Sequence, residues 1–118
     1  MHKEADAMQE YLNIPATLDD PAALTTRLQK LDVYLARLSD IITRARAMKD
    51  YAQNLYLTEN EDKLTKLSAT VSNRIIKTFL YEFNVTVDRL ELLYSTMSHI
   101  SKDLVTQISY IKQQMLLK

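Results

Sequence analysis

Few side chains in this sequence have the type and spacing that catalysis or metal binding requires. His2 and His99 are its two histidines, and His99 stands four residues before Asp103. On a helix that spacing places both side chains on one face, where they could provide two metal ligands. Such a pair is common by chance, and the Glu-x-x-His pattern of di-iron bundles is absent from the sequence. We therefore expect an ordinary histidine here and no metal or other cofactor.

The carboxylates and hydroxyls give no better case for an active site. Acid–base catalysis needs paired carboxylates in a dry, concave site. Most acidic residues here fall on expected outer faces, and Glu82 and Glu91 lie nearest the apolar stripes. Ser98 and Ser101 are close to His99 along the chain, but helical neighbours one or two residues apart do not face each other. We expect the protein not to be an enzyme.

The composition removes further chemistries and indicates the fold class. The 118 residues include no glycine, no cysteine and only two prolines. Phosphate-binding loops need glycine, and disulfides, thiolate nucleophiles and zinc–thiolate sites need cysteine. Hairpin sheets also need glycine at turns, whereas an all-α protein with few turns does not. With no apolar run long enough for a signal peptide or a membrane span, we expect a cytoplasmic protein that makes no membrane contact.

Tyrosines and apolar side chains beside the expected core are candidates for a protein–protein interface. The chain has seven tyrosines, and several fall on or beside apolar stripes. A tyrosine in that position suits the rim of a bundle and a binding surface equally well, because its ring is apolar and its hydroxyl is polar. The interface candidates are Tyr34, Ile41, Met48, Leu55, Leu80, Phe83, Tyr94 and Tyr110.

Basic side chains along the first long helix support an alternative function, association with nucleic acid. If the next helix packs antiparallel, basic residues of both helices could form one patch that contacts phosphates. The candidates are Lys30, Arg37, Arg44, Arg46, Lys49, Arg74 and Lys77. Asp40 and Asp50 stand four residues from Arg44 and Arg46 and reduce the local charge, and the chain as a whole balances 15 basic against 15 acidic side chains. Nucleic acid is therefore a possible partner that we do not favour.

One long helix must position these residues, and it is predicted from Asp20 to about Leu57. Asp20 can cap the helix, and Pro21 suits its first position. Apolar residues then recur at alternating spacings of four and three, which lays one apolar seam along the helix. The seam consists of Leu24, Leu28, Leu31, Leu35, Leu38, Ile42 and Ala45. A second column, Tyr34, Ile41, Met48 and Leu55, widens the stripe, which favours burial against more than one neighbour.

The remainder of the chain is compatible with two arrangements. Thr58 and Glu61 have the capping-box spacing and predict a second helix that begins there. A four–three apolar series from Ile76 to Met115 crosses Asn84 in phase, so one very long helix is possible. Asn84 and the β-branched residues after it also permit a break at 83–86. We expect a bundle of long antiparallel helices with coiled-coil-like packing, either three helices or a hairpin with one very long helix, and slightly favour three.

The N-terminal residues form a separate arm in this interpretation. Residues 1–19 are expected to hold a short helix, with Ala5, Met8 and Leu12 on one side, followed by a linker. Ile14 and Leu18 are expected to lie against the bundle domain, residues 20–118. The apolar stripes exceed what a thin bundle covers easily, and large uncovered patches usually mark partner sites. The predicted function is therefore interaction or scaffolding through self-association, with a homodimer as the first expectation, or through binding another protein.

Overall fold

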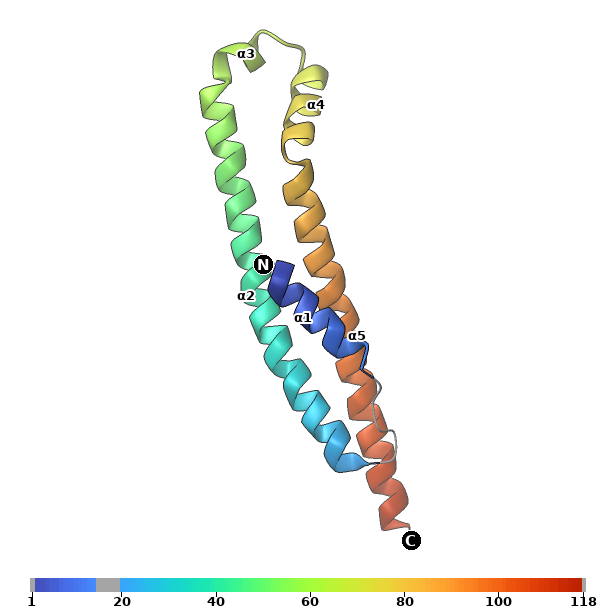
Figure 1. The fold of residues 1–118 in the computed structure, drawn as a ribbon. Coiled ribbons are helices and arrows are strands. Elements are labelled where there is room, and N and C mark those ends of the chain that lie inside the picture. The colour runs from blue at the N-terminus through green and yellow to red at the C-terminus, as the bar shows by residue number, and fades with distance from the viewer. Residues whose placement is uncertain (1, 15–19, 118) are drawn as a thin grey trace.

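The chain folds into a long helical hairpin with a short helix lying across its middle (Figure 1). The structure is a computed structural model that describes residues 2–14 and 20–117. Within these residues it contains helices and no strand, which confirms the all-α prediction. The helices are α1 (His2–Leu12), α2 (Pro21–Glu59), α3 (Glu61–Thr65), α4 (Ala69–Phe79) and α5 (Tyr81–Leu116). The molecule measures 76 × 24 × 18 Å.

Helix α2 begins where the sequence predicts. The Asp20 side chain accepts a hydrogen bond from the Ala22 N–H at 3.0 Å, and Pro21 occupies the first helical position. Pro21 lacks an N–H group that would otherwise need a partner there, so the helix starts without a cost. No residue interrupts α2 until Asn60, whose N–H bonds to the carbonyl of Tyr56.

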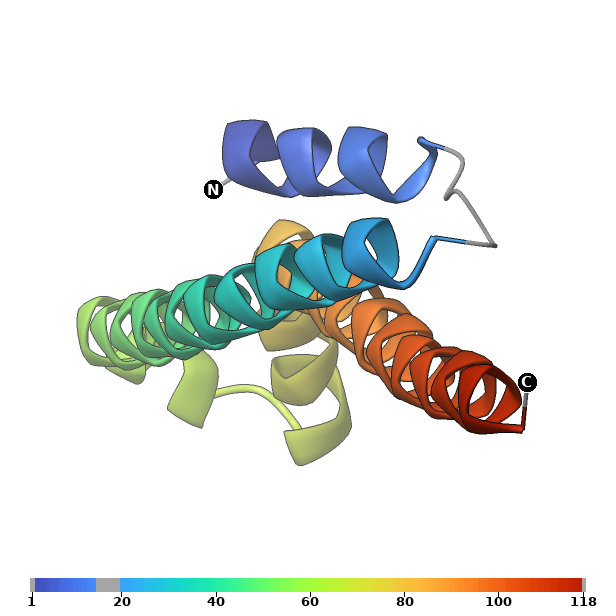
Figure 2. The same ribbon diagram turned by 90° about the horizontal axis from the view of Figure 1, so that it is seen from below.

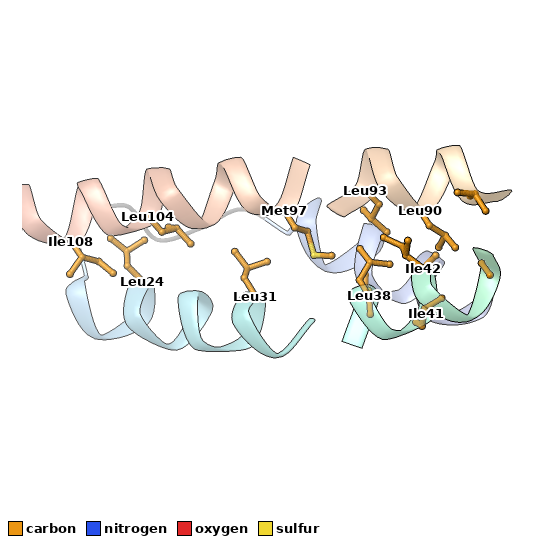
Figure 3. Packing of buried hydrophobic residues seen from close by; sticks show 14 residues of the cluster. Leu24, Leu31, Leu38, Ile41, Ile42, Leu90, Leu93, Met97, Leu104 and Ile108 are labelled. Atoms are coloured by element: carbon orange, nitrogen blue, oxygen red, sulfur yellow. The ribbon is translucent and has the colours of Figure 1, made fainter. Parts of the chain in front are cut away.

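The predicted seam forms the core between α2 and α5. Leu24, Leu31 and Leu38 are fully buried, as are Leu90 and Met97 on α5. Figure 3 shows the two rows facing each other, with Leu24 opposite Leu104 and Ile108 near one end. Burial of these side chains is the main stabilising term, at roughly 25 cal/mol for each Å² of apolar surface removed from water.

The break considered at residues 83–86 is not present, and the chain breaks instead at Leu80, between α4 and α5. Helices α4 and α5 continue along one arm, so the molecule is a hairpin, although its second arm is not the one very long helix considered (Figure 1). Helix α5 runs through Asn84, whose N–H bonds to the Leu80 carbonyl at 2.9 Å. Helices α4 and α5 meet at Leu80, which is itself buried. A β-branched residue costs a helix only a few tenths of a kcal/mol, whereas burying Val87 and Leu90 gains more.

A second helix, α3, begins at Glu61 where the sequence predicts one, but the predicted cap is wrong. The Thr58 hydroxyl donates to the Asn54 carbonyl at 2.9 Å and does not cap α3. Helix α3 ends after 5 residues, and the chain restarts at Ser68, whose Oγ accepts from the Val71 N–H at 3.3 Å. The turn of the hairpin therefore extends over α3 and the residues up to Ser68.

Helix α1 supplies the third layer that the second apolar column required. Ala5 and Met8 are buried and Leu12 is partly buried, which confirms the predicted face. Ile14 is 55% exposed, against expectation, and Leu18 lies outside the described residues. Figure 2 shows α1 on one side of α2 and α5, with α3 and α4 toward the other side. None of the helices within the described residues is long and apolar enough to cross a membrane.

Candidate interaction surface

The side chains considered for catalysis or metal binding lie apart in the structure. Among residues 2–14 and 20–117, no three His, Asp or Glu side chains gather in a possible metal site. His99 is exposed on α5, and Ser101 lies 3.4 Å from Asp32 Oδ1. Glu91 pairs with Arg46 instead of with a second carboxylate. No acid–base or nucleophilic constellation is assembled from these groups.

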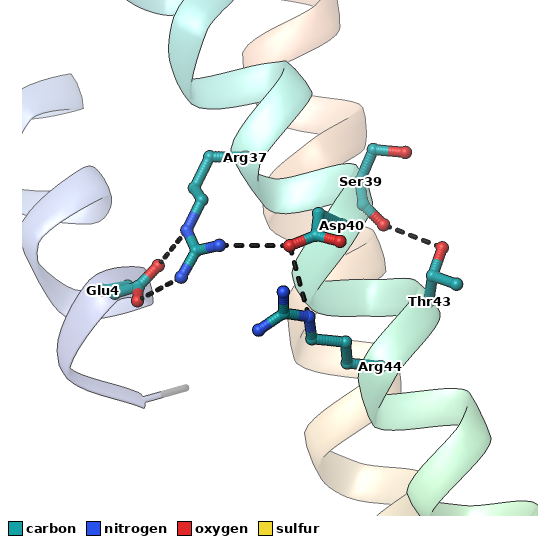
Figure 4. A network of polar contacts seen from close by, with 6 residues as sticks. All are labelled: Glu4, Arg37, Ser39, Asp40, Thr43 and Arg44. Carbon is teal, nitrogen blue, oxygen red and sulfur yellow. Dashed lines mark hydrogen bonds and ion pairs between the residues drawn. The ribbon is translucent and has the colours of Figure 1, made fainter.

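Acidic side chains pair with several of the basic nucleic-acid candidates (Figure 4). Arg37 donates from Nε and Nη2 to the two Glu4 carboxylate oxygens at 2.8 and 2.7 Å, and from Nη1 to Asp40 at 3.0 Å. Arg44 Nε reaches the same Asp40 at 3.3 Å. The hydrogen bond from Arg37 lowers the pKa of Glu4, and the same bond raises the pKa of Arg37. With Arg46 paired to Glu91, little unbalanced positive charge is left on this part of α2.

The other basic candidates do not extend that patch. Lys30 lies over the rings of Tyr11 and Tyr34, with its Nζ 4.5 and 5.7 Å from their centroids. Arg74 and Lys77 lie on α4, where the stacked rings of Tyr56 and Phe79 fix the pairing with α2. That pairing places them opposite the last turns of α2, about 10 Å or more along the axis from Lys49. The expected merging of the two basic groups is therefore not seen.

Half of the interface candidates are covered within the chain itself. Ile41 and Leu80 are buried, at 3% and 5% exposure, and Phe83 is half-buried. The Tyr34 ring is covered by Tyr11 of α1, with ring centroids 5.5 Å apart and planes at 86°. Ile41, Leu80 and Tyr34 therefore offer little surface to a partner, whereas Phe83 is only partly covered.

The other four candidates are exposed, and two of them continue the column that α1 covers. Met48 and Leu55 are 54% and 44% exposed, although they share the face of Tyr34 and Ile41. Tyr94 and Tyr110 are exposed elsewhere on α5, where the Tyr110 hydroxyl accepts from Gln114 at 2.7 Å. We call residues 46–86 the open segment. We call residues 24–45 and 87–108, across part of which α1 lies, the covered segment.

The apolar face of the open segment begins directly beyond the N-terminal end of α1. A hollow of about 250 Å³ lies there, lined by His2, Met48 and Phe83 among others. Phe79 is one turn before Phe83 and is 41% exposed, and Tyr51, between Met48 and Leu55 on the same side of α2, is 71% exposed. Sequence reasoning missed Tyr51, because it lies outside the seven-residue column; its place one turn from both Met48 and Leu55 was the available signal.

A second hollow lies at the turn of the hairpin and is wider and more open. Its volume is about 490 Å³, and its lining includes Leu57, Leu64 and Ile76 together with Thr58 and Ser72. The Ser72 hydroxyl already donates to the Leu64 carbonyl at 2.9 Å. The hollow therefore offers mostly apolar surface and few free polar groups for a small ligand.

Comparison of the chain with protein-family models, with curated proteins and with solved structures gave no match.

Proposed function

We propose that the protein is a non-enzymatic interaction or scaffolding protein that acts by self-association through the apolar face of its open segment. The observation that carries this proposal is the contrast within one column of α2. Ile41 is 3% exposed under α1, whereas Met48, seven residues further on, is 54% exposed. Tyr51, Leu55 and Phe79 of the open segment are exposed as well, and an exposed apolar surface of this kind usually marks a partner site. We call the surface of these three residues and Met48 the apolar patch.

A second copy is the partner that we favour for this patch. A single patch that packs on itself produces a closed, twofold-symmetric pair, which is the commonest form of homo-oligomer. The part of α2 from Met48 to Glu59 is about 17 Å long and lies beside one neighbouring helix. Because this contact is short, we expect it to bury less than the roughly 800 Å² per partner of a standard interface. We therefore expect a dimer that forms in a concentration-dependent way.

The test is the molar mass of the purified chain over a concentration series, by light scattering or sedimentation. The wild-type chain should approach a dimer as concentration rises, and the double variant Met48→Lys with Leu55→Lys should stay monomeric with an unchanged helical content. The control is Val33→Lys, which changes an equally apolar, 67% exposed residue of α2 outside the open segment. A wild-type chain that stays monomeric throughout would refute the proposal.

The alternative function, association with nucleic acid, depends on the three basic candidates that have neither an acidic partner nor a cation–π contact within residues 2–14 and 20–117. These are Lys49, Arg74 and Lys77. Binding to a random-sequence oligonucleotide, measured at increasing salt, tests it, because phosphate contacts weaken steeply with salt. A monomeric chain with strongly salt-dependent binding would favour this alternative over self-association.

A further inference from the structure

Helix α1 limits how a second copy can approach the apolar patch. Its N-terminal end lies at the patch, because His2 lines the same hollow as Met48 and Phe83. From there α1 runs over the covered segment, where Glu4 pairs with Arg37 of α2 and Asp6 pairs with Arg89 of α5. A second hairpin laid along this face over its whole length would collide with α1. Only the open segment is free to be overlapped.

The side-chain charges left unpaired at the two ends of this free face have opposite net sign. At one end is the first turn of α1, where Glu4 is paired with Arg37 and Lys3 has no ion-pair partner within the described residues. At the other end is the turn of the hairpin, where Glu59, Glu61 and Asp62 outnumber Lys63 and Lys66. An antiparallel second copy, overlapping the open segment alone, brings this turn to Lys3 at the end of α1. The same contact is made twice, once by each copy.

Two of these charges are unfavourably placed within a single chain. Lys3 is a cation in the first turn of α1, and Glu59 is an anion at the last residue of α2. Each charge lies at the helix end where the macrodipole has the same sign as the charge, so the two repel. Within the described residues neither forms an ion pair. A contact between Lys3 of one copy and Glu59 of the other would compensate both.

We propose that two copies pack turn to turn and antiparallel, with the open segments overlapping and α1 of each copy acting as a stop. This inference depends on the self-association proposed above and specifies its geometry. The four helical segments of the two open segments then form a short four-helix bundle. The twofold axis passes near Tyr51 and Leu55 of α2, midway between the α1 end and the turn. Contact between Lys3 and Glu59 of opposite copies fixes the register.

Single-cysteine variants test the position of the axis, because the chain contains no cysteine of its own. Near a twofold axis a residue faces its own copy, so Tyr51→Cys or Leu55→Cys should give a disulfide-linked dimer under mild oxidation. Val33→Cys and Tyr110→Cys are the controls and should not link. Linkage through Tyr110→Cys, or failure of both open-segment variants to link in a chain that is dimeric by mass, would overturn the geometry and leave self-association standing.

Charge exchange tests the register independently. Lys3→Glu and Glu59→Lys should each weaken the dimer several-fold, and the double variant, with both charges exchanged, should recover most of the affinity. The recovery is the decisive result, because each single change already removes an unfavourable interaction with the macrodipole of its own helix, so only a contact between copies makes the single variants weaker than the double variant. Single variants that dimerise like wild type, or a double variant no better than the single ones, would overturn the proposed contact. A chain that never dimerises would instead refute the underlying self-association.

Discussion

The covered and open segments are parts of the same two helical arms, yet they differ in what lies over them. In the covered segment α1 adds a third layer, and Leu31, Leu38, Leu90 and Met97 are fully buried. In the open segment α2 and α4 approach each other chiefly through the stacked rings of Tyr56 and Phe79, with centroids 4.2 Å apart. Helix α4 is amphipathic, but none of its residues is buried. The apolar pattern therefore determines which face of the helices is apolar. The position of α1 determines which part of that face is buried.

The strongest test of this contrast introduces the same charge in both segments. Leu31→Asp places an uncompensated carboxylate at a fully buried site and should cost about 4 kcal/mol or more, enough to unfold the chain. Leu55→Asp, at a site that is 44% exposed, should cost about 1 kcal/mol or less. Urea denaturation followed by circular dichroism measures both, at a concentration where the chain is monomeric. Equal losses would show that the open segment is a core of its own.

A smaller effect is expected from removing the third layer alone. Ala5 is fully buried where α1 meets the hairpin, so Ala5→Glu should undock α1 and cost about 2–3 kcal/mol. An isolated helix of 11 residues is too short to be stable in water, so the amide protons of α1 should then exchange rapidly. The amides of α2 and α5 should stay protected from exchange at Leu24 and Leu104, which lie at the end of the seam furthest from Ala5.

Ala7→Glu is the matched control for this variant. Ala7 lies two residues away on the exposed side of the same helix, so a carboxylate there stays in water. Its free energy of unfolding and its amide exchange should match those of wild type. If Ala7→Glu accelerated amide exchange in α1 as much as Ala5→Glu does, the lost stability would come from helix propensity or net charge instead of from docking.

Local signals in the sequence were enough to predict the elements of the covered segment. The spacing of Leu24, Leu31 and Leu38 identifies the buried face of α2, and Asp20 with Pro21 identifies its start. The apolar face of α1 could also be predicted, because Ala5 and Met8 are three residues apart. These features depend on helical periodicity and capping, which involve only a few neighbouring residues, so a short stretch of sequence is enough to predict them.

The arrangement of the open segment could not be obtained in this way. Thr58 and Ser68 are both plausible helix caps, and only Ser68 is used, because the choice depends on how the turn packs. Nothing near Met48 or Leu55 in the sequence indicates that α1 stops short of them. The pairing of Arg37 with Glu4 likewise joins residues 33 positions apart, so it neutralises a basic candidate that a local pattern presents as free. Such contacts follow from the tertiary structure alone.

The smallest predicted effect concerns the ion pair at the rim of the covered segment, and it depends on pH. The pKa of Glu4 is lowered in the folded chain, chiefly by its hydrogen bond from Arg37. A carboxyl whose folded pKa is below its unfolded value stabilises the folded state above the unfolded pKa, and this contribution is lost as pH falls through the folded pKa. Docking of α1 should therefore weaken in acid, below about pH 4. Arg37, whose pKa is raised, stays positively charged throughout this range.

Because both side chains are 44% exposed, solvent screens the pair and the change in docking should be modest. A titration of the amide and Tyr11 ring NMR signals from pH 7 to about pH 3 measures it, since Tyr11 contacts Tyr34 only while α1 is docked. In Glu4→Gln these signals should already be partly shifted at neutral pH and should change less on acidification. If Glu4→Gln titrates like wild type, other groups cause the acid response, and α1 is held by Ala5 and Met8 without measurable help from its ion pair with Arg37.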